Sequence, residues 1–144
     1  MTKQEYLDIY DVVGTAMEVF NTLGRGMAEP IYQDALEEEF HLRNMPVERE
    51  KLLATYYKGK RLDKTYFADF YYKDIVIELK SVDDICPEHR AQLFNYMRIT
   101  KQSRGVLINF GETRLHAERY LYVPEDDRFV LLNQDNYRQY ITDK

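Results

Sequence analysis

The chain has almost no cysteine. Cys86 is the only one in 144 residues, so an internal disulfide and zinc sites built from several cysteines are excluded. Disulfide-free chains are typical of reducing compartments, and we therefore expect a cytoplasmic protein.

A long apolar segment is also lacking. No run approaches the roughly 18 apolar residues that a membrane-spanning helix needs, and residues 1–10 are polar and amphipathic, without the hydrophobic centre of a signal peptide. These absences predict a soluble, intracellular protein with no membrane partner.

Internal repeats, low-complexity stretches and interdomain linkers are missing as well. With 44% hydrophobic residues, a chain of this length buries about 68% of its unfolded surface when it folds as one unit. We therefore expect a single domain over residues 1–144.

The charge is acidic overall but unevenly distributed. The net charge is −5: residues 1–50 hold 4 Lys/Arg and 11 Asp/Glu, residues 51–122 hold 13 and 9, and residues 123–144 hold 3 and 5. An acidic chain argues against a nucleic-acid partner, because phosphate binding requires a basic surface. The basic excess of the middle segment weakens that objection.

Apolar residues at three- and four-residue spacing predict three helices, over residues 3–23, 30–44 and 88–101. Gly24 is suited to end the first helix and Pro30 to begin the second. In the third, Leu93, Met97 and Thr100 are available to face inward.

Strands are predicted where aromatic and β-branched residues alternate or run together. The predicted strands are residues 47–57, 61–72, 75–80, 104–110, 118–123 and 128–132. Residues 105–110 are almost continuously apolar, as expected for a central strand covered on both faces. For the tail after residue 132, a short helix and an unstructured end are both open.

A two-residue turn at 73–74 joins two of these strands into a hairpin. If Tyr72 pairs with Ile75, then Asp69 lies directly opposite Glu78, and Lys80 shares the face of Glu78. The opposite face is apolar and is expected to pack, while the face with the acids carries charge. The members of the apolar face are Ala68, Phe70, Tyr72, Ile75, Ile77 and Leu79.

Two carboxylates on directly opposite strand positions repel each other by about 3 kcal/mol at an effective dielectric constant near 20. Protonation of one acid, splaying of both into solvent, or a shared divalent cation would relieve the repulsion. We favour the cation, Mg²⁺ or Mn²⁺, because hard cations take carboxylate and carbonyl oxygens. The neighbouring Lys80 would activate water or neutralise phosphoryl charge.

Residues 26–32, Gly-Met-Ala-Glu-Pro-Ile-Tyr, resemble the signature after which the GxxExxY proteins are named. That family lies within the PD-(D/E)XK nuclease superfamily. The resemblance extends from about residue 23 to residue 111 and continues through Asp69, Glu78-Leu79-Lys80, Gln92 with Tyr96, and the run Gly-Val-Leu-Ile-Asn-Phe-Gly at 105–111. Ala68 departs from it, because it stands where the superfamily name has proline.

This resemblance implies an α/β fold with a restriction-endonuclease-like core, in which helices flank a mixed central sheet containing the antiparallel hairpin. It further implies that Asp69, Glu78 and the Leu79 carbonyl bind the metal. Lys80 would be catalytic, and Glu29 would reach in from a helix as a supporting acid.

Gln92 and Tyr96 resemble the QxxxY element of RecB-like nucleases. Residues four apart share one face of a helix, and we expect this face to lie opposite that of Leu93 and Met97. The pair would hold a phosphate or orient Lys80. The implied activity is hydrolysis of phosphodiester bonds, with DNA as the expected substrate.

Each residue also has a structural explanation. Glu29 suits a helix start through the macrodipole, Tyr96 a core position and Gln92 the surface. Lys80 would extend its ammonium to solvent.

For the whole chain, the alternative is a catalytically silent nuclease fold that binds nucleic acid or a second copy of itself. A partner protein or homodimer would then supply specificity. His41, His89 and His116 lack the spacing of a helical zinc pair, and His89 is kept as a group that would support the site.

Overall fold

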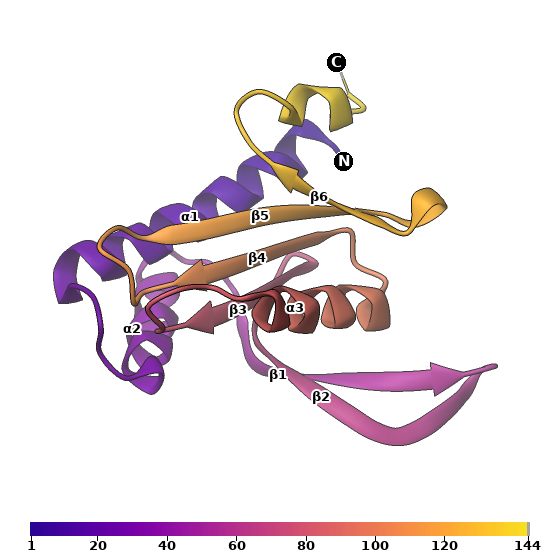
Figure 1. Ribbon diagram of the computed structural model, residues 1–144, viewed down its shortest axis with the longest axis horizontal. Coiled ribbons are helices and arrows are strands. Elements are labelled where there is room, and N and C mark those ends of the chain that lie inside the picture. Colours follow the sequence, from indigo (N-terminus) through magenta and orange to yellow (C-terminus); the bar gives the residue numbers. More distant parts are fainter. Residues whose placement is uncertain (144) are drawn as a thin grey trace.

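The computed structural model describes residues 1–143 as an α/β structure (Figure 1). The helices are α1 (Lys3–Leu23), α2 (Glu29–Leu42) and α3 (Pro87–Thr100), with short 3₁₀ turns at Pro124–Asp126 and Tyr137–Tyr140. The strands are β1 (Glu48–Tyr57), β2 (Lys60–Tyr72), β3 (Ile75–Lys80), β4 (Arg104–Asn109), β5 (His116–Val123) and β6 (Arg128–Leu132). The tail therefore forms a short helical turn, one of its two predicted states.

Within these residues, six strands form one sheet in sequence order, β1 to β6. β3 and β4 are parallel and connected through α3, whereas the other neighbouring pairs are antiparallel. A parallel pair needs such a crossover, because a tight turn can only reverse the chain. The mixed sheet with an antiparallel hairpin flanked by helices is confirmed.

Local chemistry explains the helix boundaries. Thr2 and Glu5 form a capping box at the start of α1, and Gly24 accommodates the positive φ of 76° at its end. α2 begins one residue before Pro30, because proline is favoured in a first turn. It ends at Leu42, slightly earlier than predicted.

Helices cover both faces of the sheet (Figure 1). α1 and α2 pack on one face, where Tyr32, Phe40 and Phe70 lie in a first core cluster. α3 packs on the other face, in a second cluster that includes Val76 and Met97. The prediction that only one face of the hairpin packs is therefore wrong, since the crossover helix required by the parallel pair also covers the acidic face.

The side chains of β2 before and after Asp69 that would share one face of a regular strand point to opposite faces of the sheet. Pairing with β1 is interrupted at Glu50 and Asp69, and Glu50 has φ of 52°. Ala68 consequently joins the second cluster while Phe70 joins the first. The prediction that Ala68 shares the face of Phe70 is wrong, because an irregular pair breaks the two-residue alternation.

Both hairpins close with two-residue turns, at residues 73–74 as predicted and at residues 58–59, where the predicted strands left a three-residue gap, 58–60. Lys73 and Asp74 have φ of 45° and 66°, and Lys58 and Gly59 have φ of 50° and 80°. Two successive positive φ angles define the type I′ turn, whose twist matches that of paired strands. The predicted register of Tyr72 with Ile75 is confirmed.

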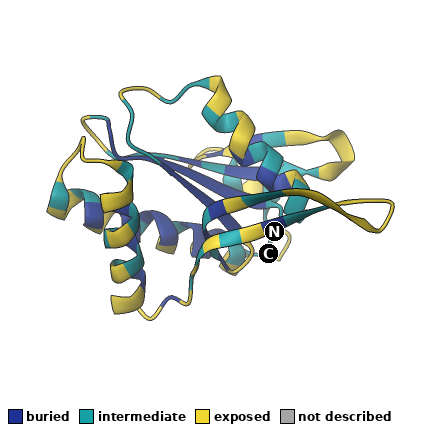
Figure 2. Cartoon of the chain, turned by 90° about the horizontal axis from the view of Figure 1, so that it is seen from below, coloured by how far each residue is buried: buried dark blue, intermediate teal, exposed yellow. Residues whose placement is uncertain are grey.

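Figure 2 shows that the sheet is buried at its centre, whereas exposed residues gather on the helices and hairpin ends. Of the helices formed by residues 1–143, none is both long enough and apolar enough to cross a membrane.

Candidate functional site

The predicted acids meet at the edge of the β2–β3 hairpin. Regular pairing extends outward to Phe70 and Ile77, one step before Asp69 and Glu78. Beyond Phe70 the backbone hydrogen bonds between β2 and β3 stop, and the Asp69 side chain takes their place. Its Oδ2 accepts the Leu79 N–H at 2.8 Å. The irregularity in β2 thus directs the Asp69 carboxylate toward β3.

Glu78 is a buried acid, with only 3% of its surface exposed. Burial raises the pKa of its carboxyl well above the usual range, the adjacent Asp69 carboxylate raises it further, and Lys80 lowers it. Its Oε1 atom has no hydrogen-bond partner among the described residues. An acid without a partner at this depth is costly, so the atom suits a cation that the protein would bind.

Glu29 approaches the same acids from the first turn of α2. It is partly buried, which raises the pKa of its carboxyl, while Lys80 lowers it and Asp69 raises it. Both effects require proximity, so α2 places Glu29 beside the hairpin carboxylates. Lys80 lies at the end of β3 and is half-buried.

Tyr32 orders the loop that precedes Glu29. It is fully buried and stacks on Phe110 with ring centroids 4.3 Å apart. Its hydroxyl donates to Gly24 O at 2.6 Å and accepts the Met27 N–H at 3.1 Å. The tyrosine three residues after Glu29 therefore fixes the entry to α2.

Gln92 and Tyr96 form a pair on α3, with Gln92 Nε2 donating to the Tyr96 hydroxyl at 3.0 Å. Burial raises the pKa of Tyr96, and the negative charge of Glu78 raises it further, which places the ring near that acid. Tyr96 belongs to the same core cluster as Leu93 and Met97. The predicted opposite face is therefore wrong for Tyr96, because consecutive helical residues are only about 100° apart, whereas Gln92 is exposed.

His89 has a local role. Its Nδ1 accepts the Cys86 N–H at 3.1 Å and thereby caps the start of α3. The histidine predicted to support the site is engaged in this cap.

Sequence reasoning missed Asn109, which is the register partner of Lys80 on β4. Its Oδ1 accepts the N–H groups of Val82 and Gly111 at 3.0 and 3.1 Å, and its Nδ2 donates to Val82 O at 2.9 Å. It therefore joins the loops that follow β3 and β4. A polar residue ending an apolar strand was the available indication.

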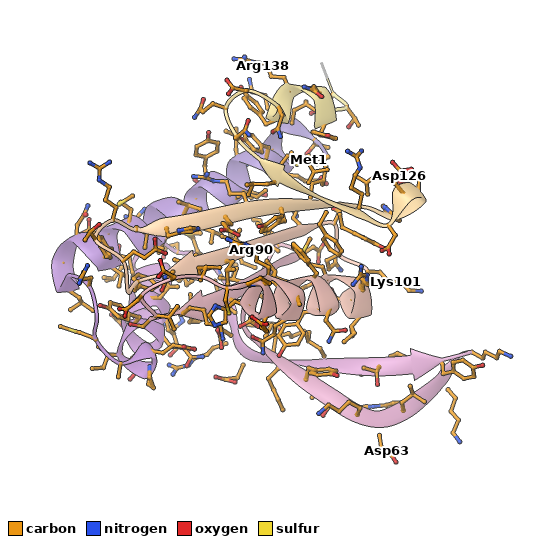
Figure 3. All side chains as sticks on the ribbon, viewed as in Figure 1. Met1, Asp63, Arg90, Lys101, Asp126 and Arg138 are labelled. Atoms are coloured by element: carbon orange, nitrogen blue, oxygen red, sulfur yellow. The ribbon has the colours of Figure 1, made fainter. Side chains whose placement is uncertain are left out.

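A second missed group lies on the same face of the sheet. Arg90 on α3 donates to both oxygens of Glu118 at 2.7 and 2.8 Å, and His116 Nε2 lies 2.7 Å from Glu118 Oε2. Figure 3 labels Arg90 where α3 crosses the sheet. Hydrogen bonds from Arg90 hold the pKa of Glu118 at about 2.

The donor set fits a hard cation. Asp69 and Glu78 supply the carboxylate oxygens that hard cations prefer, and Glu78 Oε1 has no hydrogen-bond partner among residues 1–143. No group of three or more His, Cys, Asp or Glu side chains within residues 1–143 is arranged to hold a metal. Glu29, although near Asp69, therefore does not form a three-acid metal group with Asp69 and Glu78 in this structure.

A family model described as the PD-(D/E)XK nuclease superfamily matches residues 7–120. The chain belongs to the PD-(D/E)XK nuclease superfamily. Its matched range includes Glu29, Asp69, Glu78, Lys80 and Tyr96. Membership of this superfamily supports a nuclease-type function. The narrower GxxExxY assignment remains a prediction.

Among solved structures, the crystal structure of SSO0001 is similar to this PD-(D/E)XK chain, with a TM-score of 0.52 and 22% identity. The match covers 62% of this chain and 48% of the other, so it spans about half of that protein. This similarity concerns the fold alone. The restriction-endonuclease-like α/β fold is confirmed. No curated protein matches the chain.

Proposed function

We propose that this protein is a nuclease that depends on Mg²⁺ or Mn²⁺ and hydrolyses phosphodiester bonds of DNA. The observation that carries the proposal is the buried Glu78 carboxyl group beside Asp69, whose Oε1 has no hydrogen-bond partner within residues 1–143. An apolar side chain at position 78 would be more stable when buried than a carboxyl group. Binding of a cation would explain why an acid stands there.

The metal would be held by Asp69, Glu78 and the Leu79 carbonyl. When bound, a divalent cation polarises a phosphoryl oxygen and lowers the pKa of coordinated water. Asp69 Oδ2 accepts the Leu79 N–H at 2.8 Å, so the strand itself orients that carboxylate. Such orientation fixes ligand positions before the substrate arrives.

Lys80 would place its ammonium against the phosphate oxygens and stabilise the negative charge that builds there. Its positive charge opposes the rise in the pKa of both Glu29 and Glu78, which supports a position near these two acids. Glu29 would support the metal shell as an outer carboxylate. Gln92, fixed by Tyr96, would position Lys80 or the scissile strand.

The remaining expectations concern the whole chain. We infer that it acts in the cytoplasm as a single domain. A homodimer or a partner protein would supply target specificity.

Nuclease activity is tested with purified Asp69→Ala and Lys80→Ala proteins in Mg²⁺. We expect cleavage of plasmid or oligonucleotide DNA by the parent and a loss of at least about 100-fold in each variant, since each lacks a group acting on the reacting phosphate.

Asp135→Ala and Lys3→Ala remove exposed charges far from the site and serve as matched controls. Parental activity in either site variant would refute these roles. Binding of DNA without cleavage by the parent would favour the catalytically silent alternative.

Metal binding is tested separately by thermal unfolding. A cation at 100 times its Kd stabilises the folded state by about 2.7 kcal/mol, so the parent should melt at a higher temperature in Mn²⁺. Glu78→Ala should erase the increase, whereas Glu38→Ala, on the exposed side of α2, should retain it. An equal increase in both variants would contradict the assignment of Glu78.

A further inference from the structure

The distal ends of β1 and β2 extend beyond the rest of the sheet as a two-stranded ribbon beneath α3 (Figure 1). We define residues 56–64 as the arm. All of its residues are exposed, and its strands pair only with each other, Tyr56 with Arg61 and Tyr57 with Lys60. A projecting ribbon of this kind contributes nothing to either core cluster.

The arm is basic although the protein is acidic. It carries Lys58, Lys60, Arg61 and Lys64 against one acid, Asp63, in a chain of net charge −5. Within residues 1–143, none of these four cations forms an ion pair, whereas Arg49 and Arg90 each pair with carboxylates. The arm therefore presents uncompensated positive charge to solvent.

A hollow of about 600 Å³ separates the arm from the C-terminal end of α3. Lys58 lines it from the arm, and Lys101 and Arg98 line it from the end of α3, where Arg98 also pairs with Asp127. Figure 3 shows Lys101 at the end of α3 and Asp63 on the arm. The described lining residues include no acid, so the hollow suits a phosphate chain.

An aromatic connection links the arm to the candidate active site. Lys64 Nζ lies 4.9 Å from the ring centroid of Tyr66. The Tyr66 ring lies 5.5 Å from that of Tyr96, which is buried near Glu78. A row of two aromatic rings thus connects Lys64 of the arm to the neighbourhood of the carboxylate site.

We propose that the arm and the C-terminal end of α3 bind the phosphate backbone of double-stranded DNA and hold it across the carboxylate site. A two-stranded ribbon fits the major groove, and its exposed cations neutralise phosphates. The inference rests on the proposed nuclease function for the choice of nucleic acid as the ligand.

The test is binding of a 20-base-pair duplex in EDTA, measured by fluorescence anisotropy over a range of salt concentrations. The variant K58Q/K60Q/R61Q should lower the slope of log Kd against log salt by about 2.7, since each neutralised phosphate contributes about 0.9. At 0.15 M salt this corresponds to a roughly 100-fold weaker Kd.

The matched control is K3Q/R128Q/R138Q, which changes the net charge equally. Figure 3 shows Arg138 at the opposite end of the molecule from the arm. An equal loss of slope in the control would show that only net charge matters and would overturn the proposal. Parental binding by the arm variant would overturn it as well.

Two further measurements distinguish the remaining outcomes. Sedimentation that shows a dimer dissociated by the arm substitutions would assign the arm to contact between copies and overturn the proposal. Tighter binding of the single strand than of the duplex would overturn the duplex assignment.

Cleavage separates this proposal from the proposed function. If the parent binds duplex through the arm but does not cleave it in Mg²⁺, the nuclease function fails and the arm stands. If the parent cleaves and the arm variant binds DNA like the control, the proposal that the arm binds DNA is refuted and the proposed nuclease function is retained.

Discussion

At the scale of single residues, Glu78 and Glu118 show how two buried acids acquire opposite properties. Glu78 has an unpartnered oxygen and a raised pKa, whereas Arg90, Tyr120 and His116 surround Glu118 and hold its pKa at about 2. Lys80 compensates the first acid only in part, and we propose that this acid binds a cation. The second is satisfied internally and fastens α3 to β5.

The Glu118 cluster predicts an acid-dependent loss of stability. Because the pKa of Glu118 falls from 4.5 to about 2 on folding, the unfolded chain binds more protons between these values. The stability that the lowered pKa of Glu118 contributes is therefore fully present above pH 4.5 and is lost as the pH falls toward 2. Glu118→Gln should lower the free energy of unfolding at pH 7 by about 2 kcal/mol and flatten this acid limb.

Urea unfolding at several pH values measures this effect. Glu125→Gln, an exposed acid in the same part of the chain, is the control and should preserve the parental pH profile. A Glu118→Gln protein that loses stability with acid as steeply as the parent would show that other carboxylates are responsible.

At the scale of elements, close backbone contacts hold the strand ends beside the site. Gly105 on β4 leaves room for α3, since a Cβ atom there would lie 2.5 Å from Met97 Sδ. Gly111 lies against the loop after β3, and its Cβ would lie 2.2 Å from Val82 O. The Met97 side chain can move away from an added methyl group, whereas the Val82 backbone cannot easily do so. Val82 lies two residues after Lys80, so a shift there would reach the site.

Gly111→Ala should therefore destabilise the protein by about 3 kcal/mol, because the added methyl group displaces backbone rather than a flexible side chain. DNA cleavage by the folded fraction should also fall, since the displaced Val82 segment continues from Lys80. Thermal unfolding and specific activity measure the two effects.

Gly14→Ala provides the matched control within α1. A Cβ atom there meets only Arg43 Nη1 at 3.9 Å, and alanine in a helix is favoured over glycine by about 0.5–1 kcal/mol. This variant should gain stability and keep parental activity. Loss of stability in both variants, or in neither, would contradict the packing argument.

At the scale of the whole molecule, acidic and basic residues lie in different parts of the chain. The acidic segment 1–50 contributes α1 and α2, which cover one face of the sheet, while the basic arm projects from the edge near α3. Net charge alone therefore describes the binding surface poorly. The local field at the arm has the sign that DNA requires, although the molecule is acidic.

Because the arm packs against neither core cluster, its removal should leave the fold intact. Replacing Thr55 and the arm, residues 55–64, by Asn-Gly joins Ala54 to Thr65, which are already paired, through a favourable type I′ turn. The expected change is under about 1 kcal/mol, or roughly 2–4 °C in Tm. Circular dichroism melting tests this, and loss of the cooperative transition would show that the arm supports the core.

Local rules explain why much of the fold could be predicted. The apolar spacing of α1, its end at Gly24 and the two-residue turn before Ile75 depend on neighbours within a few residues. Counting outward from the same turn is enough to place Asp69 near Glu78, because each strand step is fixed by the one before it. The family motif then added Glu29, Gln92 and Tyr96.

The sequence by itself thus determined the elements, their order and the residues of the candidate site. Only the tertiary structure decided that β2 exchanges faces at Asp69, that α3 buries Glu78 and Tyr96, and that the arm stands free. These properties depend on contacts between residues far apart in the chain. Burial by a distant helix, which sets the cost of each charge, leaves no trace in the local pattern.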